Sequence, residues 1–174
     1  MAENMPIQVE VWPVAADDMG IWLLSGDDAW RPGVPVPADS EPHFEVEMIL
    51  AQSGVCSRAT QVLHSTSWRV DGQTIILTYM AVIETDDLVR KNWPNARPIS
   101  VTLPDAVGNP STNAANEPPV PRYIDVLLHG LRHLRFLRDH DATASNAMGS
   151  TWHEHLEPFA EALAGMYGTP HHSN

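Results

Sequence analysis

The chain has 174 residues, a formal net charge of −12 and an apolar content of 43 %. A chain of this length suits one domain with a substantial core and is short for two, so we expect a single domain. Its apolar residues do not form the run of about 20 that a membrane span requires. The acidic surplus repels the phosphates of nucleic acids. Neither membrane spanning nor sequence-independent nucleic-acid binding is expected.

The cysteine content and the first residues bear on the compartment. Cys56 is the only cysteine, which excludes an intrachain disulfide, and residues 1–6 lack the basic and apolar segments of an export signal. These features predict a cytoplasmic protein. Cys56 follows the apolar Val55 and has no histidine near it in the sequence, which predicts a buried, unreactive thiol.

Two short strands are predicted at the start of the chain. Residues 7–14 and 21–24 are rich in β-branched and aromatic side chains and flank a turn around Gly20, a pattern typical of a hairpin. Pro13 lacks a backbone N–H, so it favours an edge position or a bulge. Residues 26–40 contain three prolines and are predicted to form a loop.

A helix is predicted over residues 41–53. Ser40 is suited to be its N-cap and Gly54 to end it, because a serine oxygen accepts from free N–H groups and glycine readily turns the chain out of a helix. The stripe expected to pack on a sheet consists of Val46, Ile49 and Leu50. The opposite side of the helix carries a second apolar group, Phe44, Met48 and Ala51.

Residues 61–70 and 74–84 are two further predicted strands. Asp71-Gly72 between them is a strong hairpin signal. Strict alternation along the first strand places its polar run on two faces. His64, Thr66 and Trp68 are expected on one face of the strand, and Ser65, Ser67 and Arg69 on the other. Another strand is expected at 99–103, followed by a mobile loop at 104–121, which is rich in Pro and Asn and lacks periodicity.

The leucines of residues 122–140 recur at spacings of three and four, which predicts an amphipathic helix that serves either the core or a dimer face. Gly130 within it indicates close packing against a neighbour. Arg132, Arg135 and Arg138 are expected on its solvated face. After a polar linker, Thr151 and Glu154 form a predicted capping box, and a final helix with Pro158 in its first turn extends to residue 167.

Residues 33–55 carry the outline of a longer motif that spans the predicted loop and helix. Its fitting positions are Gly33, Asp39, Ile49, Gly54 and Val55. This spacing resembles the Nudix box, with Asp39 as a shorter substitute for the first glutamate. The family's arginine position holds Glu47, and the three glutamates of its helix are replaced by Met48, Ala51 and Gln52.

The order of predicted elements is also similar to that of the Nudix family. The resemblance implies an α/β (α+β) fold, an α/β/α sandwich on a mixed β-sheet, here with additional C-terminal helices. Residues 1–140 would form the Nudix-like domain, and residues 141–174 a C-terminal helical extension packed on the same domain.

The missing glutamates determine the expected function. In the family these carboxylates hold the Mg²⁺ or Mn²⁺ that activates water, and Met48, Ala51 and Gln52 cannot replace them. We therefore expect a non-catalytic module without a resident cofactor, which binds a nucleotide-like ligand or another protein. In the family, strands at this place line the substrate cleft. The ligand contacts expected between the helix and the hairpin are His64, Trp68, Arg69 and Tyr79.

Two alternatives remain open at this point. The first is a metal-dependent hydrolase of nucleoside diphosphate-linked compounds, in which Asp39, Glu41 and Glu45 form a displaced catalytic cluster for Mg²⁺ or Mn²⁺. The simpler explanation of Glu41 and Glu45 is an acid pair in the first turn on a solvated face of the helix. The second is a structural or interaction protein in which the Nudix likeness is misleading.

Histidines occur at metal-binding spacing in two further places. His129 and His133 lie four residues apart on the predicted helix, and His153 and His155 alternate with glutamates. A spacing of four suits a metal ion, but no carboxylate lies between the first two histidines as it does in zinc proteases. Both sets are predicted to be solvated surface.

Overall fold

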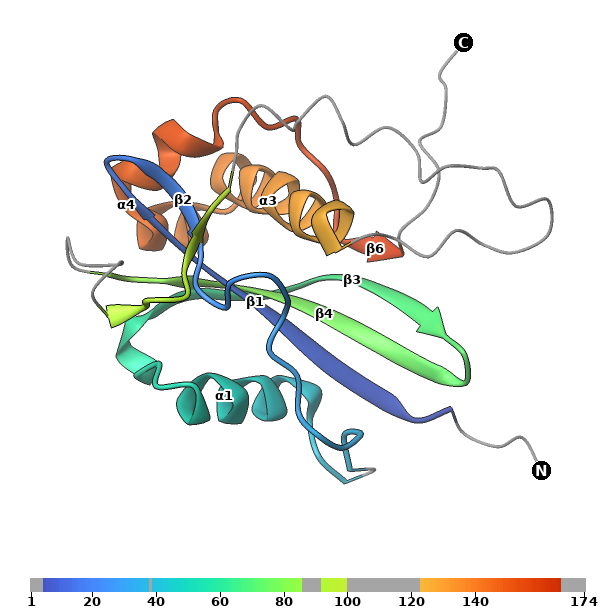
Figure 1. The fold of residues 1–174 in the computed structure, drawn as a ribbon. Helices are drawn as coiled ribbons and strands as arrows, with labels where there is room; N and C mark the ends of the chain where they lie inside the picture. The colour runs from blue at the N-terminus through green and yellow to red at the C-terminus, as the bar shows by residue number, and fades with distance from the viewer. Residues whose placement is uncertain (1–4, 38, 86–91, 100–122, 167–174) are drawn as a thin grey trace, which may run out of the picture.

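The computed structural model describes residues 5–37, 39–85, 92–99 and 123–166. Within these ranges it shows one mixed six-stranded sheet in the order β5-β2-β1-β4-β3-β6. Helix α1 covers one face of the sheet, and α3 and α4 cover the other (Figure 1). The predicted mixed α/β class, with helices on both faces of the sheet, is confirmed.

Strand β1 (Ile7–Asp17) lies inside the sheet, between β2 (Gly20–Leu23) and β4 (Thr74–Ile83). It is antiparallel to β2 and parallel to β4, so the prediction that Pro13 favours an edge position is wrong. The carbonyl of Pro13 accepts from Leu24 N–H, one residue beyond the end of β2. Proline is tolerated here because the N–H that it lacks falls where the ladder to β2 ends.

Strand β3 (Thr60–Asp71) follows a short 3-10 helix, η1 (Ser57–Ala59), and forms the predicted hairpin with β4. Gly72 at the turn has φ of 59°, a conformation that glycine adopts without steric cost. Short strands β5 (Arg97–Pro98) and β6 (Gly165–Met166) complete the sheet. Of the strand expected at 99–103, only Ile99 is described, and its N–H bonds to Ile21; the loop expected at 104–121 lies outside the described residues.

Helix α1 (Pro42–Gln52) packs on the sheet through the predicted stripe of Val46, Ile49 and Leu50. Glu41, not Ser40, is its N-cap residue, and no side chain caps the helix. The Ser40 hydroxyl instead donates to the Glu45 carboxylate at 2.6 Å. Pro42 occupies the first helical position, where its fixed φ suits the start of a helix. Gly54, with φ of 87°, ends the helix as predicted.

Helices α3 (Tyr123–His140) and α4 (Ala142–Leu156) share one core with the opposite face of the sheet. The predicted close packing at Gly130 is confirmed, because a Cβ at this position would collide with the side chain of Met80 on β4. On α4, Met148, Trp152 and Leu156 are at most 3 % exposed. Within the described residues, no helix is both long and apolar enough to cross a membrane.

The C-terminal helix differs from the prediction in its extent. Residues 142–150, expected as a linker, are helical, and Asp141 caps them by accepting from the N–H groups of Thr143 and Ala144. Gly149 interrupts α4 with φ of 74°, so a new helical stretch begins near the predicted start at Thr151. The helix nevertheless ends at Leu156, and Pro158 lies beyond it.

Two predictions about exposure are wrong. Cys56 is exposed, because it lies after Gly54 where the chain leaves α1. Arg135 and Arg138 are not solvated, with side chains 16 % and 9 % exposed. Both donate to backbone carbonyls near the end of α4, and both pair with Asp139 and Glu157.

Candidate functional site

A β-bulge in β3 determines which of the predicted contact residues lie together. The register shifts between Ser65 and Ser67, where Thr66 is extra relative to β4. A bulge of one residue exchanges the two faces for everything beyond it. The predicted alternation, with His64 and Trp68 on one face and Arg69 on the other, is therefore wrong.

The four expected ligand contacts are divided between the two faces of the sheet. His64 and Arg69 lie on the α3 side, where His64 meets His133 and Arg69 binds Glu10. Tyr79 lies on the α1 side, in the same core cluster as the α1 stripe. Trp68 is 40 % exposed and pairs in register with Leu77, which packs against the same cluster as Tyr79. The structure does not bring the four into one cleft.

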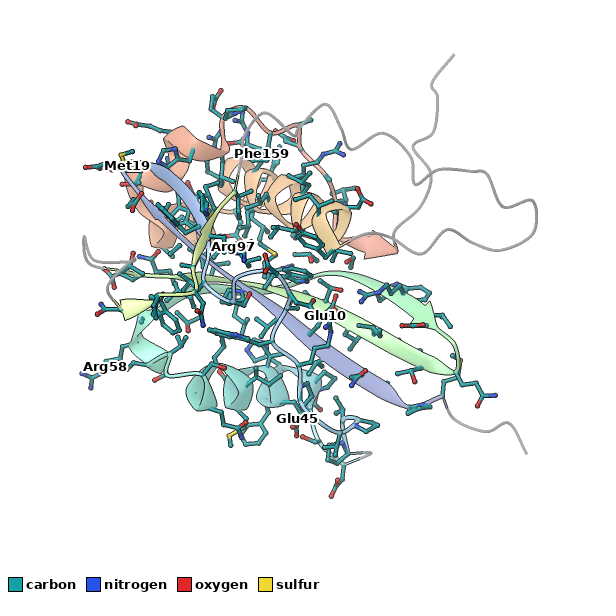
Figure 2. The ribbon with its side chains drawn as sticks, viewed as in Figure 1. Glu10, Met19, Glu45, Arg58, Arg97 and Phe159 are labelled. Atoms are coloured by element: carbon teal, nitrogen blue, oxygen red, sulfur yellow. The ribbon has the colours of Figure 1, made fainter. Side chains whose placement is uncertain are left out.

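Arg69 belongs to a buried ion-pair network around Glu10. The Glu10 carboxylate is 0 % exposed and accepts from Arg69 at 2.6 and 2.9 Å, from Arg31 at 2.9 and 3.1 Å, and from Thr78 at 2.7 Å. Burial alone raises the pKa of Glu10, but the donors and the positive charges of Arg69 and Arg31 together hold it below its ordinary value. This network links β1, β3, β4 and the loop after Trp30 (Figure 2 labels Glu10).

His64 and His133 form a second linked pair on the same side of the sheet. His133 Nδ1 lies 3.0 Å from the Ala162 carbonyl, which only accepts, so Nδ1 carries the hydrogen. In the neutral ring Nε2 then accepts, and it lies 3.2 Å from Nδ1 of His64. Burial, together with the nearby His64 and His129, lowers the pKa of His133 and outweighs its backbone hydrogen bond.

His129 contacts the Thr66 carbonyl at 3.3 Å, and His133 is 3 % exposed. The prediction of a solvated pair is therefore wrong for His133. In the part of the chain that the structure describes, no group of three or more His, Cys, Asp or Glu side chains is arranged to hold a metal ion.

The carboxylates considered for a displaced hydrolase site lie at the start of α1. Asp39 and Glu41 are exposed, and Glu45 accepts the hydrogen bond from Ser40. Burial, and secondly the charge of Glu41, raises the pKa of Tyr79 beneath the helix. In Figure 2, Glu45 lies toward the start of α1 and Arg58 lies beyond its other end.

The positions that would form the Nudix box surround the same helix. Gly33 lies in the exposed loop before α1, and Gly54 follows its last turn. Met48, Ala51 and Gln52 all lie on exposed positions of the helix. Met48 is 41 % exposed and the adjacent Phe44 is 54 % exposed. Where the resemblance places an anionic cluster, α1 therefore presents an apolar surface.

A pocket of about 190 Å³ adjoins this surface, between α1, η1 and the first residues of β3. Its apolar lining comes from Leu50, Ala51, Val55 and Leu63, and its polar lining from His43, Glu47, Ser57 and Thr60. The volume is below the ~300 Å³ at which pockets begin to enclose a small molecule. It suits one or two apolar side chains of a larger partner.

A wider and more open depression of about 700 Å³ lies between α3 and α4. Its arginine and acids neutralise one another, and hydrogen bonds from Arg138 and Arg135 lower the pKa of Asp139 to about 2. Ser145 Oγ lies 3.3 Å from His153 Nε2, which resembles a nucleophile and base. However, Nε2 also lies 3.0 Å from the Ser145 carbonyl, so it carries a hydrogen and does not accept the hydroxyl proton.

Comparisons with known proteins do not assign the chain to a family. No protein-family model matches the chain, and no curated protein matches it by sequence. The Nudix resemblance stays a prediction from residues 33–55 and the order of elements.

Sequence reasoning missed Glu10 and the pocket at α1. Glu10 had a readable signal, since strict alternation from Trp12 and Val14 places a carboxylate on the same apolar face of β1. A charge at such a position predicts a buried partner. The pocket had no local signal, because Leu50 and Leu63 meet only in the folded chain.

Proposed function

We propose that this protein is a non-catalytic binding module that holds a segment of another protein against α1. The observation that carries the proposal is the exposed apolar pair Phe44 and Met48 beside a small pocket with apolar residues in half of its lining. Apolar surface that is concentrated in one place and adjoins a pocket is typical of a protein interface. We also propose a cytoplasmic location, supported by the single, exposed thiol of Cys56.

A protein partner is favoured over a nucleotide-like ligand by the division of the expected contacts. Of the two side chains expected to stack on a base, Trp68 lies on the face opposite Arg69, and His64, on the same face as Arg69, contacts His133. The guanidinium of Arg69 is also engaged by Glu10. Within the described residues, the acids of α1 offer no cluster for Mg²⁺ or Mn²⁺, which gives the hydrolase alternative no support.

The proposal is tested by crosslinking from defined positions in cells that make the protein. A photoreactive amino acid is placed at Met48 in one variant and at Met19 in another, because both methionines are exposed and they lie on different parts of the fold. We expect a discrete protein adduct from position 48 and none from position 19. The adduct should disappear when Phe44→Ser is added.

A second measurement addresses catalysis. The protein is mixed with ADP-ribose or related dinucleotides and with Mg²⁺ or Mn²⁺, and both melting temperature and phosphate release are followed. We expect neither a shift nor release. Metal-dependent release would overturn the non-catalytic assignment, and a melting shift without release would replace the protein partner with a nucleotide.

A further inference from the structure

We infer that the partner segment is cationic and amphipathic, with apolar side chains for the pocket and lysines or arginines around them. This inference rests on the proposed function, whose site is the surface of α1 formed by Phe44, Met48 and the adjoining pocket. It adds the chemistry of the partner. The argument combines the apolar centre of this surface with the sign of the charges at its margin.

The margin of the surface is acidic. Glu41 and Asp39 are exposed before the helix, the Glu47 side chain is 60 % exposed, and Glu45 is partly exposed. The helix carries no lysine or arginine. His43 lies 3.8 Å from Glu47, and this single imidazole is outnumbered by the four carboxylates. Arg58 is the nearest cation along the chain, and Figure 2 shows it past the end of α1 opposite Glu45.

The imbalance extends along the whole N-terminal part of the sequence. Before residue 58 the chain has ten acids and a single base, Arg31, and Arg31 is paired with Glu10 and Asp28. A basic segment therefore approaches this surface through an attractive field, which raises its association rate and excludes acidic competitors. The pocket then supplies affinity by burying one or two apolar side chains.

The acidic charge around this surface also disfavours two other binding partners, a second copy of the chain and an anionic membrane. A second copy of the chain would bring Glu41 and Glu47 against the same acids of its neighbour, and like charges across an interface are costly. Anionic lipid headgroups are repelled for the same reason. A cationic segment relieves the repulsion among the acids of α1, whereas a second copy or an anionic membrane increases it.

The test uses two helical probe peptides that differ only in charge. One has leucines at spacings of three and four and lysines at the remaining positions, so that its leucines form a single face of the helix, and the other has glutamate at every lysine position. Fluorescence anisotropy measures binding of each to the intact protein. We expect the lysine peptide to bind, more weakly as salt is raised, and the glutamate peptide not to bind.

Matched variants locate the binding. Met48→Ser should abolish it, whereas Met19→Ser, at an exposed methionine elsewhere, should leave it unchanged. Glu41→Gln combined with Glu47→Gln should weaken it by roughly three- to tenfold, as expected for two exposed charge pairs. The control is Asp18→Asn combined with Glu154→Gln, which removes the same charge from exposed positions outside α1.

The outcomes separate this inference from the function on which it rests. If both peptides bind and both lose affinity on Met48→Ser, the site is real and the cationic inference is wrong. If the lysine peptide binds but Asp18→Asn with Glu154→Gln weakens it as much as the α1 charge variant does, the attraction is general and the inference again fails. If neither peptide binds while position 48 still yields a crosslinked partner, only the cationic inference is overturned.

Discussion

At the scale of single residues, Glu10 has the largest predicted effect on stability. Removing this carboxylate by Glu10→Ala leaves Arg31 and Arg69 partly buried without their shared counter-ion. Breaking a buried pair in this way costs about 3 kcal/mol or more of unfolding free energy. Urea denaturation measures the loss. Asp27→Ala, which breaks the ion pair of Asp27 with Arg97 at 64 % exposure on both sides, should cost at most about 1 kcal/mol.

The same carboxylate predicts a dependence of stability on pH. Because the pKa of Glu10 is lower in the folded protein than its ordinary value of 4.5, the folded state binds this proton less well than the unfolded state does. Its contribution is complete above about pH 4.5 and is lost as pH falls through the lower, folded value. Glu10→Gln keeps the size of the side chain and should flatten the stability profile below pH 4.5. An unchanged profile would contradict this role.

At the scale of elements, the close contact between α3 and β4 is tested at Gly130. Alanine favours a helix by about 1 kcal/mol over glycine, but its Cβ would collide with the buried side chain of Met80. Overpacking of this kind costs about 1–3 kcal/mol, so Gly130→Ala should destabilise the protein in urea denaturation. In a Met80→Ala background the collision is absent, and the same change should stabilise. The same sign in both backgrounds would show that Met80 is not the obstacle.

The segment after α4 lies along α3 and is held there by side chains of that helix. Arg132 donates to the Ala160 carbonyl at 3.1 Å, and His133 donates to the Ala162 carbonyl at 3.0 Å. The N–H of Ala162 returns a bond to Arg132 at 3.2 Å. This attachment includes a titratable group in a buried place, because His133 is 3 % exposed and burial disfavours its charged form.

Acid should therefore loosen this segment before the rest of the fold. The pKa of His133 is lowered in the folded state, so the attachment is complete above the ordinary value near 6.5 and weakens as pH falls below it. Hydrogen exchange at Ala162, corrected for its intrinsic rate, should show progressive loss of protection as pH falls below about 6.5. His133→Asn retains a donor near Nδ1 but does not titrate, so it should remove this dependence. A dependence that persists would assign it to another group.

The elements differ in how much of them the sequence predicts. The β3–β4 hairpin was predictable because Asp71-Gly72 is a local signal, and the end of α1 because Gly54 permits a positive φ. The bulge at Thr66 has no comparable signal, and it moved Arg69 to the same face as His64 and Trp68 to the opposite face. Helix α4 was missed at its start although Asp141 is a suitable cap. The His64–His133 contact joins positions 69 residues apart, a separation at which the local pattern of residues gives no information.

At the scale of the whole molecule, two cores lie on opposite faces of one sheet. One contains α1, and the other contains α3 and α4. Every residue of β1 from Val9 to Ala15 is buried, and its side chains alternate between the two cores. This shared strand couples the layers, so damage to one core should lower the stability of the other.

Trp152→Ala tests that coupling from the last helix of the described chain. Trp152 is 3 % exposed in the core of α3 and α4, so its removal should cost about 3–5 kcal/mol and lower the melting temperature by roughly 10 °C. Trp68→Ala removes the same side chain at a position 40 % exposed and should cost much less.

Hydrogen exchange in the Trp152→Ala variant then shows whether the two cores unfold together or separately. If the cores unfold as one unit, amides of α1 lose as much protection as those of α3 when Trp152 is removed. If α4 is instead an independent attachment, only α4 and its neighbours on α3 lose protection, and the surface of α1 remains intact.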